Sequence, residues 1–546
     1  MAEVVLTGGR VFGRDDADTV VLRGGRVLSV GAVDDLRSLI TPATTVIRTK
    51  GRLVMPGFQD GHVHPLAGGL LESWCDLRDA SDAADTLTRV RDYALRNPDL
   101  PWIVGGGWTS AFFPDRSPTA VLLDSAVSDR PVYLMGSDLH DAWVNTAALR
   151  RAGIGSHTAD PPRGTIARDH RGDPAGTLHE AAADLVGRHL PPLDQTILEE
   201  ALCAAQRLLH REGIIAWQDA LVGPYLGLPD PLPAYLAVAE RGGLTGRVSL
   251  ALWWDPDRGL EQLEELRERR ELARAAGLPA DHVKIMQDGI CENGWAALLT
   301  PYLDRSASLP SRLDPERLRE AVTALDQAGF SVHFHAVGDR AVRECLDAVE
   351  AAVSASADHG RRRHHIAHVQ LVADDDLPRF AELDVTATVQ PLWAAEIPGM
   401  RKTYEPLLGG SRVDRQYPFG GLLRAGARLA AGSDWPVSSP NPLWGSYVAA
   451  TRLPALASAP WLGPDFRPAP FNPSEIIAVP EILHAYTAGT AHLHDHPATL
   501  TEGAPADIAI LDRDVLGGDP ESLSEAQVDL TIAGGRCVHD RHGEWE

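Results

Sequence analysis

Short apolar runs alternate with amphipathic stretches through the central part of the chain. Residues 194–212 place Leu198, Leu202 and Leu209 on one face of an expected helix, and the apolar run 214–217 follows as a strand. The alternation continues with expected strands at 248–252, 283–286, 330–336, 365–369, 385–390 and 428–431, and with expected helices at 260–276, 314–328 and 340–352. Repeated βα units of this length predict an α/β protein built on a (β/α)8 TIM-like barrel.

Both ends of the chain have a different pattern. Short apolar runs broken by glycines occur near each terminus, at 4–7, 19–22, 27–30, 507–511 and 530–535. We therefore expect residues 1–56 and 490–546 to form one composite β-sandwich domain. Residues 57–489 would then form the barrel.

Residues 70–190 do not keep the βα rhythm and are rich in Trp, Gly, Pro and Asp. We interpret them as an insertion after the first barrel strand that covers the mouth of the barrel. The chain contains no internal repeat and no low-complexity tract.

The bulk composition is that of a soluble globular protein, with 44% of the 546 residues hydrophobic and 23% charged. The formal net charge of −24 argues against nucleic acid and anionic membranes as partners. The five cysteines are far apart and form no C-x-x-C pair, which favours a reducing, cytoplasmic location. We find neither a signal peptide nor an apolar run long enough to span a bilayer, so no membrane association is expected.

The first candidate for metal binding is the segment GFQDGHVH, residues 57–64. His62 and His64 are two apart on an extended segment, so both side chains point the same way. Two neutral imidazoles on one face can hold one divalent cation. Because the pair follows an apolar run near the first barrel strand, we predict that His62 and His64 are metal ligands.

Lysine is rare in this chain, and one of its three occurrences lies inside an expected strand. Lys284 is flanked by Val283 and Ile285, where a buried ammonium group is costly unless it is paired or modified. Its amine can take up carbon dioxide to give a carbamate, an anion that can bridge two metal ions as a carboxylate does. The alternative is a lysine at the strand edge that extends to Asp288.

Further candidates lie at the ends of later strands. His333 and His335 share a face of one expected strand, and we choose His335 because it is nearer the carboxyl end, where barrel sites lie. His333 remains the alternative ligand or a supporting group. His368 ends the next strand. Asp434 follows an apolar run and can ligate metal and transfer a proton, the alternative being an N-cap for the next segment.

Several fragments, in this order along nearly the whole chain, resemble the amidohydrolase superfamily and its branch of N-substituted formamide deformylases and related hydrolases. The matching fragments are residues 56–64, 106–108, 138–145, 176–180, 335–341, 432–436, 486–491 and 506–509. Gln59 departs from the pattern, which has a small or apolar residue before the aspartate.

The resemblance implies a binuclear zinc centre, with about two Zn²⁺ per chain. The first zinc ion would be held by His62, His64 and Asp434. The second would be held by His335 and His368, and carbamylated Lys284 would bridge the two. All six positions are filled by the expected residue types.

It also implies hydrolysis of a C–N bond in a small molecule: an amide, an N-substituted formamide or a cyclic amide, rather than a peptide. A metal-activated hydroxide would attack the carbonyl group, and Asp434 would pass the proton to the leaving nitrogen. His140 would hydrogen-bond the carbonyl oxygen or the substrate. Trp108, Trp393 and Trp435 are candidates for an aromatic pocket wall, and a homodimer is a reasonable expectation.

Two other readings stay open. The same metals could support deamination, ester hydrolysis or a lyase step, and a mononuclear site with an unmodified Lys284 would favour deamination. The other alternative is not an enzyme: a catalytically silent regulatory scaffold built on the same barrel. It predicts missing ligands, and none is missing here.

Overall fold

Eight parallel strands form the central sheet of the protein in a computed structural model that describes residues 3–113, 116–355, 362–463 and 465–545. The strands are β7 (Phe58–Val63), β14 (Ile214–Val222), β15 (Arg247–Trp253), β16 (His282–Met286), β17 (Ser331–Ala336), β18 (His365–His368), β19 (Thr386–Val389) and β20 (Leu429–Ala431). Their order in the sheet is their order along the chain.

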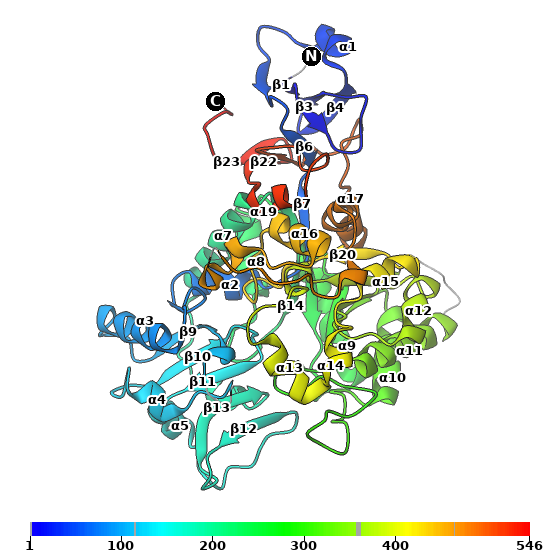
Figure 1. Ribbon diagram of the computed structural model, residues 1–546. Helices are drawn as coiled ribbons and strands as arrows, with labels where there is room; N and C mark the ends of the chain where they lie inside the picture. Colours follow the sequence, from blue (N-terminus) through cyan, green and yellow to red (C-terminus); the bar gives the residue numbers. More distant parts are fainter. Residues whose placement is uncertain (1–2, 114–115, 356–361, 464, 546) are drawn as a thin grey trace.

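Two backbone hydrogen bonds connect the end of β20 to the end of β7. The amide of Asp434 donates to the carbonyl of His62 at 2.7 Å, and the amide of His64 donates to the carbonyl of Trp435 at 2.8 Å. The sheet therefore nearly closes on itself, and the predicted TIM-like barrel is confirmed (Figure 1).

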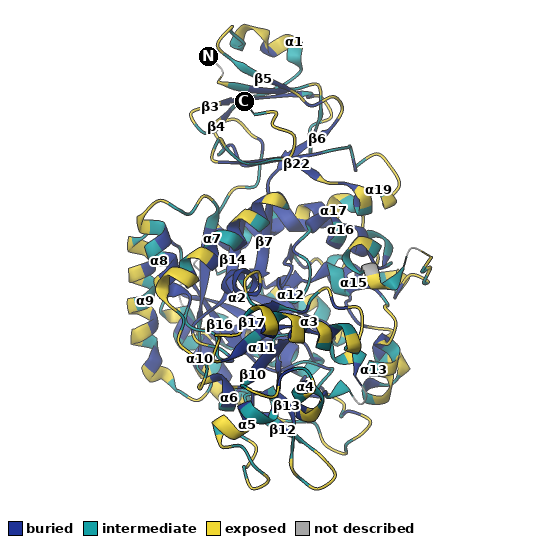
Figure 2. Ribbon diagram, turned by 90° about the vertical axis from the view of Figure 1, so that its left-hand side faces the viewer, coloured by how far each residue is buried: buried dark blue, intermediate teal, exposed yellow. Residues whose placement is uncertain are grey.

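Helices cover the outside of the barrel and expose one face to the solvent, while the barrel strands are buried (Figure 2). They include α7 (Gln195–Arg211), α8 (Leu232–Glu240), α9 (Leu263–Ala275), α10 (Pro315–Gln327), α11 (Asp339–Ala355), α12 (Leu377–Glu382) and α15 (Phe419–Arg424). Local signals set their ends: Asp314 caps α10 by accepting a hydrogen bond from the Glu316 amide at 2.9 Å. Within the described residues, none of the helices combines the length and the apolarity needed to cross a membrane.

Strand β14 is longer than the apolar run that predicted it. The run ends at Trp217, but the strand continues to Val222 through Gln218 and Asp219, which are both buried. These polar side chains lie among the ends of the parallel strands, where barrel enzymes place their functional groups. The hydrophobic pattern therefore underestimates the strand where the barrel interior becomes polar.

The insertion between β7 and α7 is an ordered α/β unit with its own six-stranded sheet, in the order β12-β13-β11-β10-β9-β8. Its strands are β8 (Cys75–Asp76), β9 (Ile103–Trp108), β10 (Val132–Gly136), β11 (Asp141–Val144), β12 (Gly164–Arg168) and β13 (Pro174–Glu180). Helices α3 (Ala83–Arg96), α4 (Ala120–Asp124) and α5 (Thr146–Ala152) accompany them. Figure 1 shows this unit at the opposite end of the molecule from the two chain termini.

Strands from both ends of the chain meet in one small sheet. This five-stranded sheet has the order β2-β6-β21-β22-β23 and contains β2 (Arg10–Val11), β6 (Leu53–Pro56), β21 (Ile508–Leu511), β22 (Val528–Ala533) and β23 (Arg536–Asp540). A four-stranded sheet beside it contains β4 (Arg26–Gly31), β3 (Thr19–Arg23), β1 (Val4–Thr7) and β5 (Thr45–Arg48). An ion pair between Arg247 and Asp507, at 2.6 Å, links the five-stranded sheet to the barrel.

Candidate metal centre

A cavity of about 60 Å³ lies at the carboxyl ends of the barrel strands. The turn between β10 and β11 of the insertion contributes to its wall. All six expected metal ligands line it, namely His62, His64, Lys284, His335, His368 and Asp434. His140 of the insertion lines it as well.

The tightest cluster of candidate ligands consists of His62, His64 and Asp434, and it joins the two ends of the barrel sheet. His62 Nε2 lies 3.3 Å and His64 Nε2 lies 3.1 Å from the same oxygen, Asp434 Oδ1. Their ligand atoms all lie within 4.8 Å of one another, a spacing that a single cation could fill. Gly432 permits this close approach, because a Cβ there would lie 2.7 Å from the His62 amide nitrogen.

His333 contacts His62 rather than the cavity. Its Nε2 shares a 2.9 Å hydrogen bond with His62 Nδ1, which leaves His62 Nε2 facing Asp434. In metal sites the second nitrogen of a ligating histidine is usually held in this way. His333 thus occupies the supporting position, and His335 is the member of the pair that lines the cavity.

His335 and His368 lie beside each other, with ring centroids 4.3 Å apart. His335 Nδ1 is 3.3 Å from Asp288 Oδ1, which leaves its Nε2 available to a ligand. Both ring nitrogens of His368 are buried without a hydrogen-bond partner among the described residues. A metal ion would satisfy these orphaned nitrogens, whose burial is otherwise costly.

Two of the ligand candidates adopt a left-handed backbone, with φ of 79° at His368 and 56° at Asp434. Residues other than glycine rarely occupy this region, and such strain concentrates at functional sites. His368 is the last residue of β18, and Asp434 lies three residues after the end of β20; both side chains line the cavity.

Lys284 is 1% exposed. No hydrogen bond or ion pair within the described part of the chain ends on its amine, and burial lowers its pKa to about 7. The alternative partner, Asp288, is occupied elsewhere: it accepts hydrogen bonds from the amides of Ala297, Val337 and Gly338. Lys284 is therefore not the edge lysine that extends to Asp288, and a partly uncharged amine facing the cavity is the form that can add carbon dioxide.

Burial also keeps three of the ligand candidates, His62, His335 and His368, neutral. It lowers the pKa of His62 to about 3 and holds those of His335 and His368 well below the usual value. Neutral imidazole is the form that binds a metal ion. This donor set of imidazoles, a carboxylate and an amine that can be carboxylated fits a divalent transition metal.

Asp60 connects the two strands that carry the tightest cluster. Its carboxylate accepts a hydrogen bond from the His62 amide at 3.0 Å, and from the amide and hydroxyl of Ser433 at 3.0 and 2.5 Å. Burial raises its pKa to about 7. The sequence showed Asp60 within the GFQDGHVH segment, but only the fold shows what it contacts. Asp219 of β14 is another buried carboxylate. Unlike Asp60 it lines the cavity, and the sequence analysis did not foresee it.

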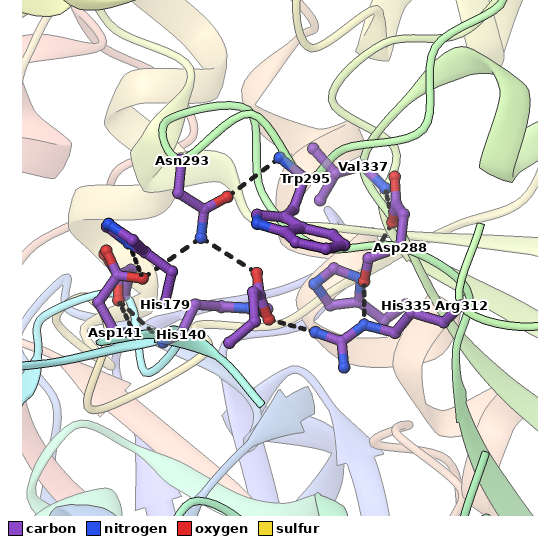
Figure 3. Close-up of polar contacts among 11 residues, drawn as sticks. His140, Asp141, His179, Asp288, Asn293, Trp295, Arg312, His335 and Val337 are labelled. Carbon is purple, nitrogen blue, oxygen red and sulfur yellow. Dashed lines mark hydrogen bonds and ion pairs between the residues drawn. The ribbon is translucent and has the colours of Figure 1, made fainter. Parts of the chain in front are cut away.

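His140 is held by a buried polar network (Figure 3). Both Glu180 carboxylate oxygens lie 3.0 Å from His140 Nδ1. Glu180 also accepts hydrogen bonds from Asn293, at 3.1 Å, and from Arg312. Burial would lower the pKa of His140, but the Glu180 carboxylate outweighs it and raises that pKa. The ring lies beside His335, with centroids 5.3 Å apart.

Of these partners, Glu180 lies in the fragment 176–180 that carried the family resemblance, but no role had been assigned to it. Arg312 and Asn293 lie in the loop after β16, outside any motif. The sequence analysis therefore missed this network. Of its three members, only Glu180 lies in a fragment that could have drawn attention to it.

The three tryptophan candidates separate. Trp393 lies parallel to the His368 ring at 5.4 Å and lines the second hollow described below. Trp108 packs in the core of the insertion, and Trp435 is buried against Gly68. Of the three candidates for a pocket wall, Trp108 and Trp435 do not line the two hollows, because both rings are enclosed by packing.

Comparisons with known proteins agree with this architecture. The model of the amidohydrolase family matches residues 45–539. LONG AFTER FAR-RED 3 from Arabidopsis thaliana is 31% identical, with 99% of this chain and 92% of that protein covered. N-substituted formamide deformylase from Arthrobacter pascens is 25% identical, with 96% of each covered. The crystal structure of an uncharacterized metal-dependent hydrolase from Pyrococcus furiosus is 25% identical with a TM-score of 0.68, covering 94% of this chain and 99% of that one. Since one family model spans most of the sequence, the chain belongs to the amidohydrolase family.

Proposed function

We propose that this protein is a metal-dependent hydrolase that cleaves a C–N bond in a small amide. The observation that carries the proposal is the convergence of His62, His64 and Asp434, whose ligand atoms lie within 4.8 Å of one another in a cavity shared with the other expected ligands. The names of the Arthrobacter and Pyrococcus relatives, a formamide deformylase and a metal-dependent hydrolase, support the same reading.

The proposed centre holds two Zn²⁺. His62, His64 and Asp434 would hold one, and His335 and His368 the other. Lys284, as its carbamate, would bridge them. When bound, such ions supply Lewis acidity: they lower the pKa of water and polarise a carbonyl group.

The residues of the chain carry the proton transfers. Asp434 takes a proton from the attacking water and delivers it to the leaving nitrogen, since it lies at the centre of the ligand cluster and lines the cavity. His140 donates a hydrogen bond from Nε2 to the carbonyl oxygen. Its Nδ1 is fixed by Glu180, so the other ring nitrogen is the one left for a substrate.

Metal content and amide turnover, measured on the same preparations, test the proposal. Protein purified without chelator and with bicarbonate present is expected to hold about two zinc ions per chain and to hydrolyse members of a panel of N-substituted formamides, acetamides and cyclic amides. Chelation should abolish turnover and zinc should restore it. Asp434→Asn, which keeps the shape of the side chain, serves as the inactive control.

Each contrary result has a defined meaning. About one zinc ion per chain, with ammonia release from amino-substituted heterocycles, would replace amide hydrolysis by a mononuclear deamination. A protein that binds no metal even after reconstitution would refute the proposal and leave the scaffold reading.

A further inference from the structure

Two neighbouring hollows share part of their lining at the candidate metal centre. The first is the cavity of about 60 Å³ described above, and the second has a volume of about 320 Å³. The residues that line both hollows are Asp138, His140, His335, His368, Asp434 and Val437. The hollows therefore share the groups that would act on a carbonyl group and diverge on either side of them.

The first hollow extends over the barrel wall at β14. Its outer part is lined by the loop that follows this strand, with Leu226 and Leu228, and by Leu66 of α2 (Pro65–Leu71). We call this part the β14 lobe. It is apolar, and such walls accept a hydrocarbon group because burial removes that group from water.

The second hollow extends over the opposite part of the barrel rim, above β17 to β19. Its outer part, which we call the β19 lobe, is lined by Trp393, Ile397 and Tyr404 from the segment after β19 and by Ile290 from the loop after β16. Ile397 is 40% exposed, so this lobe opens towards the solvent. Its walls are mainly apolar and aromatic.

A formamide does not fill this shape. Its acyl carbon carries only hydrogen, so a formamide whose carbonyl group sits between His140 and Asp434 leaves one lobe empty. An amide with a substituent on its carbonyl carbon and another on its nitrogen places one group in each lobe. Burial of both groups adds binding free energy that the formamide lacks.

We infer that the site takes N-substituted amides of acids larger than formic acid, with one apolar group in the β14 lobe and another in the β19 lobe. This inference rests on the proposed function for its chemistry, but its claim about ligand shape can be tested without turnover.

Hydroxamic acids provide that test, since R–CO–N(OH)–R′ chelates a metal ion through its two oxygens and is not hydrolysed as an amide. Three compounds are compared on the zinc-loaded protein by calorimetry: N-benzylformohydroxamic acid, phenylacetohydroxamic acid and N-benzylphenylacetohydroxamic acid. The third, which has a group on each side, is expected to bind at least about tenfold more tightly than either of the others. The matching amides are assayed for turnover in parallel.

Filling each lobe separately sharpens the test. Leu228→Trp narrows the β14 lobe, and Ile397→Trp narrows the β19 lobe. Each variant should reduce the binding affinity of one of the two one-sided compounds about tenfold, and the compound affected should differ between the two variants. Leu272→Trp is the control, because Leu272 lies on the outer surface of α9 with 57% exposure. If Leu228→Trp does not fold, the comparison of the three compounds on the unaltered protein still tests whether the site accepts an apolar group on each side.

The inference is overturned if the two-sided compound binds no more tightly than the better one-sided compound, or if both lobe variants weaken the same compound. Preferred turnover of N-benzylformamide over N-benzylphenylacetamide would also overturn it, while leaving amide hydrolysis intact. Conversely, tight two-sided binding without turnover of any amide would remove the proposed function and keep the inferred ligand shape.

Discussion

His333 Nε2 lies 2.9 Å from Nδ1 of His62, so a histidine of β17 orients a histidine of β7 whose other nitrogen faces Asp434. The two residues are 271 positions apart in the sequence. Both are buried, and the contact fixes which His62 nitrogen is available to a metal ion.

This contact predicts that His333→Ala weakens metal binding without unfolding the barrel. Loss of the supporting hydrogen bond should reduce zinc affinity about 10- to 100-fold, measured by competition with a chromogenic chelator. His333→Asn can still form a hydrogen bond with His62, so its zinc affinity should fall less. The control is His210→Ala, because His210 is also buried but bonds to Thr245 and to the Ile214 carbonyl instead of a ligand. Equal losses in the control and in His333→Ala would contradict the proposed role.

Removal of Lys284 should separate the two metals. Lys284→Ala is expected to lower zinc content from about two to one or fewer per chain and activity by on the order of 10²-fold or more. Because the proposed bridge is a carboxylate-like group, short carboxylic acids added to the alanine variant should restore part of the activity. In the unaltered protein, removal of bicarbonate during zinc reconstitution should lower the active fraction. Retention of full activity by Lys284→Ala would eliminate the carbamate bridge.

Glu180 should affect turnover through His140. Glu180→Ala removes the carboxylate that holds His140 Nδ1, and we expect kcat to fall about tenfold or more with little change in zinc content. Glu180→Gln keeps an acceptor for the ring and should retain more activity. The matched control is Asp376→Asn, because Asp376 is also a buried carboxylate but pairs with Arg343 at 2.8 Å outside both lobes. A loss of zinc in Glu180→Ala equal to the loss of kcat would indicate a general disruption of the centre instead.

The same carboxylate predicts a change of stability with pH. Burial opposes ionisation of Glu180, but His140 and Arg312 outweigh it and lower its pKa from 4.5 to about 2. Since the folded-state pKa is the lower one, the stabilisation is fully present above about pH 4.5 and is lost as pH falls towards 2. Glu180→Gln should therefore reduce the free energy of unfolding of the metal-free protein by about 3 kcal/mol at pH 7, and the difference should shrink below pH 4.5.

Urea unfolding at pH 7, 5 and 3.5 measures this difference. Glu271→Gln is the control, because its 3.1 Å pair with Arg274 is exposed and should contribute little at any pH. A difference between the unaltered protein and Glu180→Gln that stays constant over this pH range would contradict the prediction.

Local pattern in the sequence was enough to predict the barrel. Apolar runs and amphipathic helices such as α7 and α10 reflect burial along a single element, which a single segment of sequence reveals. The same logic located the candidate ligands, because a polar residue directly after an apolar run lies at a strand end. The prediction stopped short at β14, where buried Gln218 and Asp219 interrupt the apolar pattern.

The sequence by itself therefore determined the α/β class, the order of the barrel strands and the set of candidate metal ligands. Only the tertiary structure decided that His333 supports His62, that Asp288 faces His335 instead of Lys284, and that Glu180 holds His140. These choices depend on contacts between residues 40 to 271 positions apart. No local pattern encodes such a contact, because it forms only when the strands are brought side by side around the barrel.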